Sequence, residues 1–199
     1  MTRRSNSLAQ RDIKNVLHPY TNIASHNDNG PTIITKGEGI YVYDEAGKKY
    51  MEGLSGLWCT SLGFNNKRLI EAANKAMRQL PFYHTFGSKS HPAAIALAEQ
   101  LIEMAPVPMS KVFFANSGSE ANDTAVKIIW YINNALGLEK KKKIIARKKS
   151  YHGVTLMTAG LTGLPNNHRD FDLPLSRVLH TDCPHFYRYG KTNQSEEQF

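Results

Sequence analysis

The chain has 199 residues, of which 41% are hydrophobic and 21% are charged. This balance supplies an apolar core and excludes a disordered tail. The longest apolar run, residues 93–98, is far shorter than the roughly 20 residues that cross a bilayer, and the mean hydropathy is −0.44. We therefore expect neither a membrane span nor a membrane partner.

The N-terminal residues and the two cysteines indicate the cellular compartment of the protein. Two arginines follow Met1, but the apolar segment of a secretory signal does not follow them. The two cysteines, Cys59 and Cys183, match neither a metal-ligand pair nor a disulfide framework. These features predict a cytoplasmic protein without a metal site, in which both cysteines are packing residues.

Basic residues exceed acidic ones by 25 to 17, giving a formal charge of +8. Such an excess raises the question of a nucleic-acid partner. Many of the basic residues cluster at 140–143 and 147–149, around an apolar pair, without the stacking aromatics of an RNA-binding motif. We interpret them as a solvated helix end and strand edge, and expect no nucleic-acid partner. The excess charge would also attract a small phosphorylated or carboxylated ligand.

The first third of the chain predicts a small antiparallel element. Residues up to about Lys14 are polar and lack a period, which predicts a loosely held arm. Three β-rich runs follow, and Asp44–Gly47 has the composition of a hairpin loop between the last two. Two amphipathic helices are expected after them. The runs cover 32–35, 40–43 and 48–51, and the helices cover 66–80 and 91–104.

The remainder predicts a βαβ unit and hence a parallel sheet covered by helices, an α/β fold. Strands are expected at 111–115, 143–147 and 177–180, with a long helix after the first that Gly137 ends. That helix should bury its apolar stripe, made of Ala121, Ala125, Ile128, Ile129, Ile132 and Leu136. Ser195 and Gln198 open a further helix with a capping box. Two or three strands cannot complete a doubly wound sheet. We therefore expect the sequence to be the front part of a larger protein.

The strongest local signal for chemistry is Ser117-Gly118-Ser119-Glu120, where strand passes into helix. Ser117 and Glu120 stand in capping-box relation, and Gly118 lets a ligand approach the backbone closely. The free N–H groups of the first helical turn then suit a phosphate. An ordinary capped helix with nothing bound is the alternative.

A second signal, Ser150-Tyr151-His152-Gly153, follows the next strand and so lies at the same carboxyl edge, where open α/β sheets bind ligands. The Tyr151 ring would lie against a flat ligand, and His152 would donate a hydrogen bond near it. A loop tyrosine packed on the next helix is the alternative. Together the two loops suit a phosphorylated aromatic ring.

These residues resemble the class III pyridoxal-phosphate-dependent aminotransferases, of the ω-amino acid or amine:pyruvate transaminase type. The resemblance covers nearly the whole chain, and residues 83–86 before a helix add to it. Five segments carry the resemblance: 17–21, 39–44, 53–59, 114–122 and 151–153. The last three of them are the most specific.

The resemblance implies the fold type I architecture of pyridoxal-phosphate-dependent transferases, here incomplete. Residues 1–60 would be an N-terminal arm and part of the small domain, and 61–199 would begin the mostly parallel large domain. The family forms homodimers and transfers an amino group from an amine or amino acid to a 2-oxo acid, usually pyruvate, by a ping-pong route. Ser117, Gly118 and Ser119 would hold the cofactor phosphate.

Further site residues follow from the same resemblance. Tyr151 would stack on the pyridine ring with His152 beside it. Trp58, Tyr20 and Phe86 would wall the substrate pocket, Phe86 from the partner subunit, and core packing is the alternative for each. Aromatic walls suit amines with apolar or aryl substituents.

The chain also departs from the family. The lysine that forms the Schiff base and the acidic residue that pairs with the ring nitrogen belong to a region beyond Phe199, so no catalytic residue is assigned. We expect the 199 residues alone not to catalyse transamination, since the lost proton transfer alone is worth about 10² to 10⁴ in rate. A catalytically inactive, truncated protein that binds pyridoxal phosphate or a sugar phosphate is the alternative function.

Overall fold

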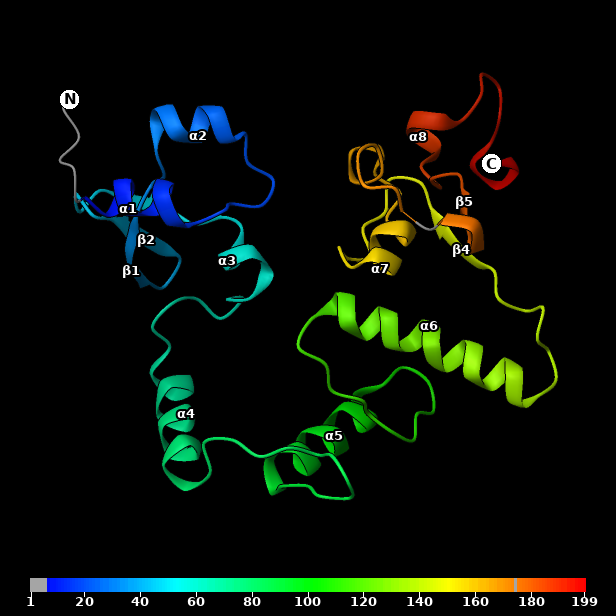
Figure 1. The fold of residues 1–199 in the computed structure, drawn as a ribbon, viewed down its shortest axis with the longest axis horizontal. Coiled ribbons are helices and arrows are strands. Elements are labelled where there is room, and N and C mark those ends of the chain that lie inside the picture. Colours follow the sequence, from blue (N-terminus) through cyan, green and yellow to red (C-terminus); the bar gives the residue numbers. More distant parts are fainter. Residues whose placement is uncertain (1–6, 174) are drawn as a thin grey trace. The chain divides into compact units, whose positions relative to one another are not determined.

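The computed structural model describes residues 7–173 and 175–199 (Figure 1). The chain divides into two compact units, Met1–His91 and Pro92–Phe199. Each unit has its own small sheet, with three strands in the first and two in the second. The described helices include none that is long and apolar enough to cross a membrane.

The first unit is built around an antiparallel sheet with the strand order β1-β2-β3. The predicted hairpin between the second and third strands is confirmed, and Gly47 has the positive φ of 80° that its loop requires. The elements of the unit are α1 (Leu8–Asn15), α2 (Ile23–Asn29), β1 (Ile34–Glu38), β2 (Tyr41–Asp44), β3 (Lys49–Met51), α3 (Ser55–Trp58) and α4 (Lys67–Gln79).

The expectation of a loosely held arm up to Lys14 is wrong for the residues that the structure describes, because α1 occupies them. The Ser7 hydroxyl accepts the amide of Gln10 at 3.3 Å and so begins this helix. The helix is short and its apolar residues are few, so a search for helical periodicity passes over it, whereas the capping serine marks its start. Residues 1–6 lie outside the described part.

The hairpin is anchored by the carboxylate of Asp44. Its Oδ1 accepts the amides of Ala46 and Lys48, both at 2.9 Å, and its Oδ2 accepts the Tyr50 hydroxyl at 2.7 Å. The Tyr50 hydroxyl, followed by these amides, lowers the pKa of the Asp44 carboxyl, since all of them favour its charged form. One side chain thus fixes the loop and joins it to β3.

The second unit contains a parallel pair of strands, β4 (Ile144–Arg147) and β5 (Val178–Thr181), with Ile144 opposite Val178 and Arg147 opposite Thr181. They confirm two of the three predicted strands. The other elements are α5 (Pro92–Met104), α6 (Gly118–Ala135), α7 (Leu156–Leu161), α8 (Phe186–Tyr189) and three 3-10 turns at Pro165–Asn167, Leu175–Arg177 and Glu196–Gln198. The predicted capping box at Ser195 is present, and it begins the last of these turns.

The strand predicted at 111–115 is not formed. Strand assignment requires a hydrogen-bonded neighbour, and no segment of the described chain pairs with these residues. Their backbone leads directly into α6, and Phe113 and Phe114 are 68% and 42% exposed. The composition of this run favours a strand, but composition does not supply the partner.

The core of the second unit joins α6, β4, α7 and β5 through one residue from each: Val126, Ala146, Leu161 and Val178. The predicted buried stripe of α6 is wrong, because Ile128, Ile129, Ile132 and Leu136 are 46–66% exposed. The helix instead buries Val126 and Asn133. Polar bonds explain this rotation: Asn133 Nδ2 donates to the Lys141 carbonyl at 2.9 Å, and Trp130 Nε1 donates to the Lys142 carbonyl at 3.0 Å.

Replacing Leu161 by Ala should lower the free energy of unfolding by about 2 kcal/mol or more, because the change leaves a cavity in this core. Leu161 is only 6% exposed, whereas Leu156 on the same helix is 68% exposed. Leu156→Ala is the matched control and should change stability by about 0.5 kcal/mol at most. Urea unfolding of both variants measures the difference, and equal losses would contradict the assigned core.

Replacing Tyr50 by Phe should raise the pKa of Asp44 toward its ordinary value, because the largest stabilising hydrogen bond to the carboxylate is lost. The lowered pKa stabilises the fold above the ordinary carboxyl pKa of about 3.9, and this contribution disappears as the pH falls through the lowered value. NMR titration of the Asp44 carboxyl carbon provides the measurement. Tyr41→Phe is the control on the neighbouring strand, and an equal shift in both variants would refute the assignment.

Candidate functional site

The N-terminus of α6 presents backbone amides to solvent. The Ser117 hydroxyl oxygen accepts the amide of Glu120 at 3.2 Å, which caps the helix as predicted. The reciprocal bond differs from the expected capping box, because the Glu120 carboxylate accepts the amide of Asn116, at 2.8 Å, instead of that of Ser117. The first two helical amides, those of Gly118 and Ser119, are the positions whose N–H groups no helical carbonyl can accept. They are therefore open to an anion.

Space for a ligand exists beside these amides. A Cβ built on Gly118 would meet no other heavy atom within 4 Å. The Ser119 hydroxyl oxygen accepts the amide of Val154 at 3.1 Å, so its proton stays available to donate. Two amides and one hydroxyl thus converge at a helix N-terminus, which also favours negative charge through its dipole.

The loop of residues 150–154 lies against this helix end, as predicted from the sequence. Besides the Ser119 bond, Asn122 Nδ2 donates to the carbonyl of His152 at 2.8 Å. From the other side, the Thr162 hydroxyl accepts the amide of His152 at 2.9 Å and donates to the carbonyl of Gly153 at 3.1 Å. The structure therefore brings the two predicted loops together into one site.

Gly153 is required by this close approach. Its φ is 131°, and an added Cβ would collide with the Ser119 hydroxyl oxygen and lie 2.6 Å from that of Thr158. Thr158 is fully buried, so it cannot move aside without cost. The absence of a side chain at 153 thus sets the distance between the loop and α6.

The two side chains predicted to face a cofactor ring, Tyr151 and His152, differ in exposure and in hydrogen bonding. Tyr151 is 49% exposed and so presents part of its ring to solvent. His152 is half-buried, and its Nε2 lies 3.0 Å from the Ser150 hydroxyl oxygen. Since that hydroxyl donates to the carbonyl of Arg147, His152 Nε2 is the donor to Ser150. The bond fixes the orientation of the imidazole ring.

Trp58 is presented by a strained turn in the first unit. All four residues of α3, from Ser55 to Trp58, have positive φ values between 51° and 70°, so the turn is left-handed. Three of them carry a Cβ, and each such residue costs roughly 1–2 kcal/mol in this conformation. The Glu52 carboxylate supports the turn by accepting the amides of Leu54 and Gly56 at 2.9 Å and 2.6 Å. Strain of this kind is concentrated at functional sites.

The three predicted pocket residues lie in the first unit, whereas the phosphate-binding residues lie in the second. Tyr20, Trp58 and Phe86 are 77%, 70% and 84% exposed. Core packing within this chain therefore does not explain them. Cys59, expected to be a packing residue, is also exposed.

Several positioning residues were missed by the sequence analysis. Asn122 and Thr162 hold the loop, and the Thr155 hydroxyl donates to Asp123 Oδ1 at 2.9 Å. Thr155 and Thr158 also form a reciprocal capping box at the start of α7. This box was readable from its Thr-x-x-Thr spacing, but its contact with α6 was not, because it joins residues far apart in sequence.

Replacing Gly153 by Ala should lower the melting temperature of the second unit, since the new Cβ would separate the loop from Ser119 and Thr158. The matched control is Gly118→Ala, which adds the same methyl group at the start of α6, where no other heavy atom lies within 4 Å. We expect that control to leave the melting temperature unchanged. Calorimetry measures both variants, and a Gly153 variant as stable as the control would contradict the close approach.

The donor set fits a phosphorylated ring. The described amides and hydroxyl would hold the phosphate of pyridoxal phosphate, and Tyr151 would meet its ring. The family described as Aminotransferase class-III matches residues 22–199 of this chain. A curated relative, gamma aminobutyrate transaminase 3, chloroplastic, from Solanum lycopersicum, is 50% identical over 98% of this chain and 38% of its own length.

Solved structures extend the similarity. The omega transaminase from Pseudomonas jessenii in complex with PMP is 60% identical, with a TM-score of 0.95 over 97% of this chain and 43% of that one. The W58G variant of the thermostable omega transaminase PjTA-R6, engineered for asymmetric synthesis of enantiopure bulky amines, has a TM-score of 0.94 and 60% identity over 96% of this chain and 43% of that one. This chain thus spans less than half the length of these relatives. It has the α/β fold of the pyridoxal-phosphate-dependent transaminases, and it belongs to the class III aminotransferases.

Proposed function

We propose that this chain supplies the phosphate- and ring-binding part of an aminotransferase site. The reaction would move an amino group from an ω-amino acid or amine to a 2-oxo acid, with pyruvate as the expected acceptor, by a ping-pong route. The observation that carries this proposal is the meeting of Ser119 with the Tyr151 loop through the bond to the Val154 amide.

The residues have separate roles in this proposal. When bound, pyridoxal phosphate supplies an electron sink for the reacting carbon. The amides of Gly118 and Ser119 and the Ser119 hydroxyl bind its phosphate, and Tyr151 covers its ring. His152 would lie beside the ring, oriented by the contact of its Nε2 with the Ser150 hydroxyl oxygen at 3.0 Å. These groups orient the cofactor but do not move the proton between the reacting atoms.

Trp58, Tyr20 and Phe86 are proposed as walls of the substrate pocket. Their exposure and the strained turn at Trp58 support this role. The engineered PjTA-R6 variant, aimed at bulky amines, changes a tryptophan of the same number. We propose amines with apolar or aryl substituents as donors, and an aliphatic ω-amino acid such as the substrate in the name of the tomato relative as the runner-up.

The proposal includes a homodimer in which Phe86 comes from the partner subunit, and a cytoplasmic location. It assigns no proton-transferring lysine among the described residues. Lys148 and Lys149 lie just before the loop, and neither is assigned this role; Nζ of Lys148 is paired with Asp182 Oδ1 at 2.7 Å. We therefore expect the 199-residue chain to show no amino transfer on its own.

Replacing Ser119 by Ala should weaken the binding of pyridoxamine 5′-phosphate to this chain by about 10- to 100-fold, because a charge-assisted hydrogen bond is worth roughly 1.5–3 kcal/mol. Equilibrium dialysis with both proteins measures the affinity. Ser110→Ala, which removes an exposed hydroxyl outside the site, is the matched control and should bind like the parent chain.

Two further ligands separate the competing functions. Pyridoxamine without its phosphate should bind far more weakly if the helix end holds the phosphate. Glucose 6-phosphate binding more tightly than pyridoxamine 5′-phosphate would favour the sugar-phosphate alternative. If Ser119→Ala leaves the affinity for pyridoxamine 5′-phosphate unchanged, the assignment of the Ser119 hydroxyl to phosphate binding is rejected.

A further inference from the structure

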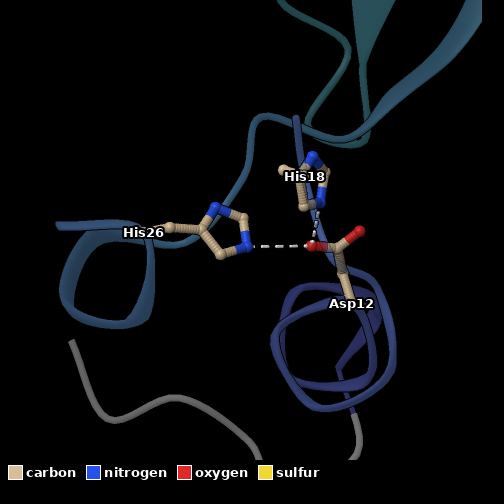
Figure 2. A group of neighbouring side chains, drawn as sticks. All are labelled: Asp12, His18 and His26. Atoms are coloured by element: carbon tan, nitrogen blue, oxygen red, sulfur yellow. Dashed lines mark hydrogen bonds and ion pairs between the residues drawn. The ribbon is translucent and has the colours of Figure 1, made fainter. Parts of the chain in front are cut away.

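Two histidines and one aspartate converge in the first unit, outside the site described above (Figure 2). Asp12 lies on α1, His26 lies on α2, and His18 lies on the segment between them. Nε2 of His18 is 2.8 Å from Asp12 Oδ1, and Nε2 of His26 is 3.2 Å from the same oxygen. Two imidazole nitrogens thus point at a single carboxylate oxygen.

The cluster is shielded but still reachable from solvent. The side chains of His26, Asp12 and His18 are 9%, 18% and 32% exposed. The two rings lie close together, with centroids 4.5 Å apart and planes tilted by 43°. This packing holds both rings near the carboxylate, so a ligand would meet donors that are already oriented.

The separations suit a metal ion. The three candidate ligand atoms lie within 4.8 Å of one another. Nitrogen and oxygen ligands lie roughly 2.0–2.2 Å from tetrahedral zinc, which places any two of them about 3.3–3.6 Å apart. The two contacts to Asp12 Oδ1 would have to lengthen, by a few tenths of an ångström from His26 and by about half an ångström or more from His18. The two histidine nitrogens, which lie within the 4.8 Å limit, would have to come to about 3.3–3.6 Å from each other.

We propose that Asp12 Oδ1, His18 Nε2 and His26 Nε2 form a site for a divalent transition metal of the zinc class. Imidazole and carboxylate ligands are those that such an ion accepts, and water would complete a tetrahedral set. The ion would join α1, α2 and the segment between them. This inference does not rest on the proposed aminotransferase function, since none of its residues belongs to that site.

The metal-free form is also accounted for. Without an ion, both rings donate Nε2–H to the carboxylate, which satisfies the half-buried oxygen. On metal binding each ring would carry its proton on Nδ1 instead, so that Nε2 offers its lone pair. The sequence analysis predicted no metal site from the two cysteines. Asp12, His18 and His26 are separated by six and eight residues, a spacing that matches no compact metal-binding motif.

The test is titration of the complete, chelator-treated 199-residue chain with zinc chloride, followed by isothermal calorimetry. We expect saturable binding of one zinc ion at this cluster. X-ray absorption of the loaded chain should then reveal a shell of nitrogen and oxygen ligands with the multiple scattering of two imidazoles. Absence of saturable binding, or a zinc shell without imidazole, would overturn the proposal, and neither result depends on a variant.

Variants locate the ion. His26→Gln and Asp12→Asn should each weaken zinc binding at least about tenfold, the loss typical even of residues that only support a metal ligand. The matched control, His185→Gln, removes an exposed histidine whose ring faces Tyr187 and Tyr189, and it should leave the affinity unchanged. Far-ultraviolet circular dichroism verifies that the helices persist. Parent-like affinity in the folded Asp12 or His26 variant would refute the site.

Discussion

The hydrogen bond from the Val154 amide to the Ser119 hydroxyl oxygen is the contact on which the proposed cofactor site is built. It joins the end of one helix to a loop that is distant in sequence. It also uses the acceptor side of the hydroxyl and leaves the donor side for an anion. The contact is possible only because Gly153 carries no side chain, so the backbone conformation of one residue controls the chemistry of another.

The surrounding core is small for such a demanding arrangement. Among the described residues of the second unit, it has one buried apolar residue from each of four elements with Trp130, Ile144 and Met157 packed against them, while the apolar stripe of α6 stays exposed. Side-chain hydrogen bonds therefore do part of the positioning: Asn133 and Trp130 orient the far end of α6, and Asn122 and Thr162 fix the loop. Polar bonds of this kind specify geometry more than they add stability.

The sequence predicted the features that depend on local chemistry. The hairpin at Gly47, the cap at Ser117 and the two parallel strands around α7 are all confirmed. The errors concern partners that a local pattern does not contain. The run at 111–115 needs a neighbouring strand, and the orientation of α6 depends on carbonyls at 141 and 142. The α1 helix was missed because its signal is a cap, not a period.

The two functional regions differ in how a sequence can reveal them. The proposed cofactor site uses residues at the start of α6 and in the loop after β4, so short runs of adjacent letters suffice to suggest it. The histidine–aspartate cluster is assembled by the relative placement of α1 and α2, and its three residues are unremarkable in isolation. The left-handed turn at Trp58 is similar, since three of its four residues are not glycine. The Glu52 carboxylate bonds hold it, together with backbone bonds from the amides of Trp58 and Cys59 to the carbonyls of Leu54 and Ser55. Strain and convergence are properties of the fold, and they point to candidate sites that residue patterns do not contain.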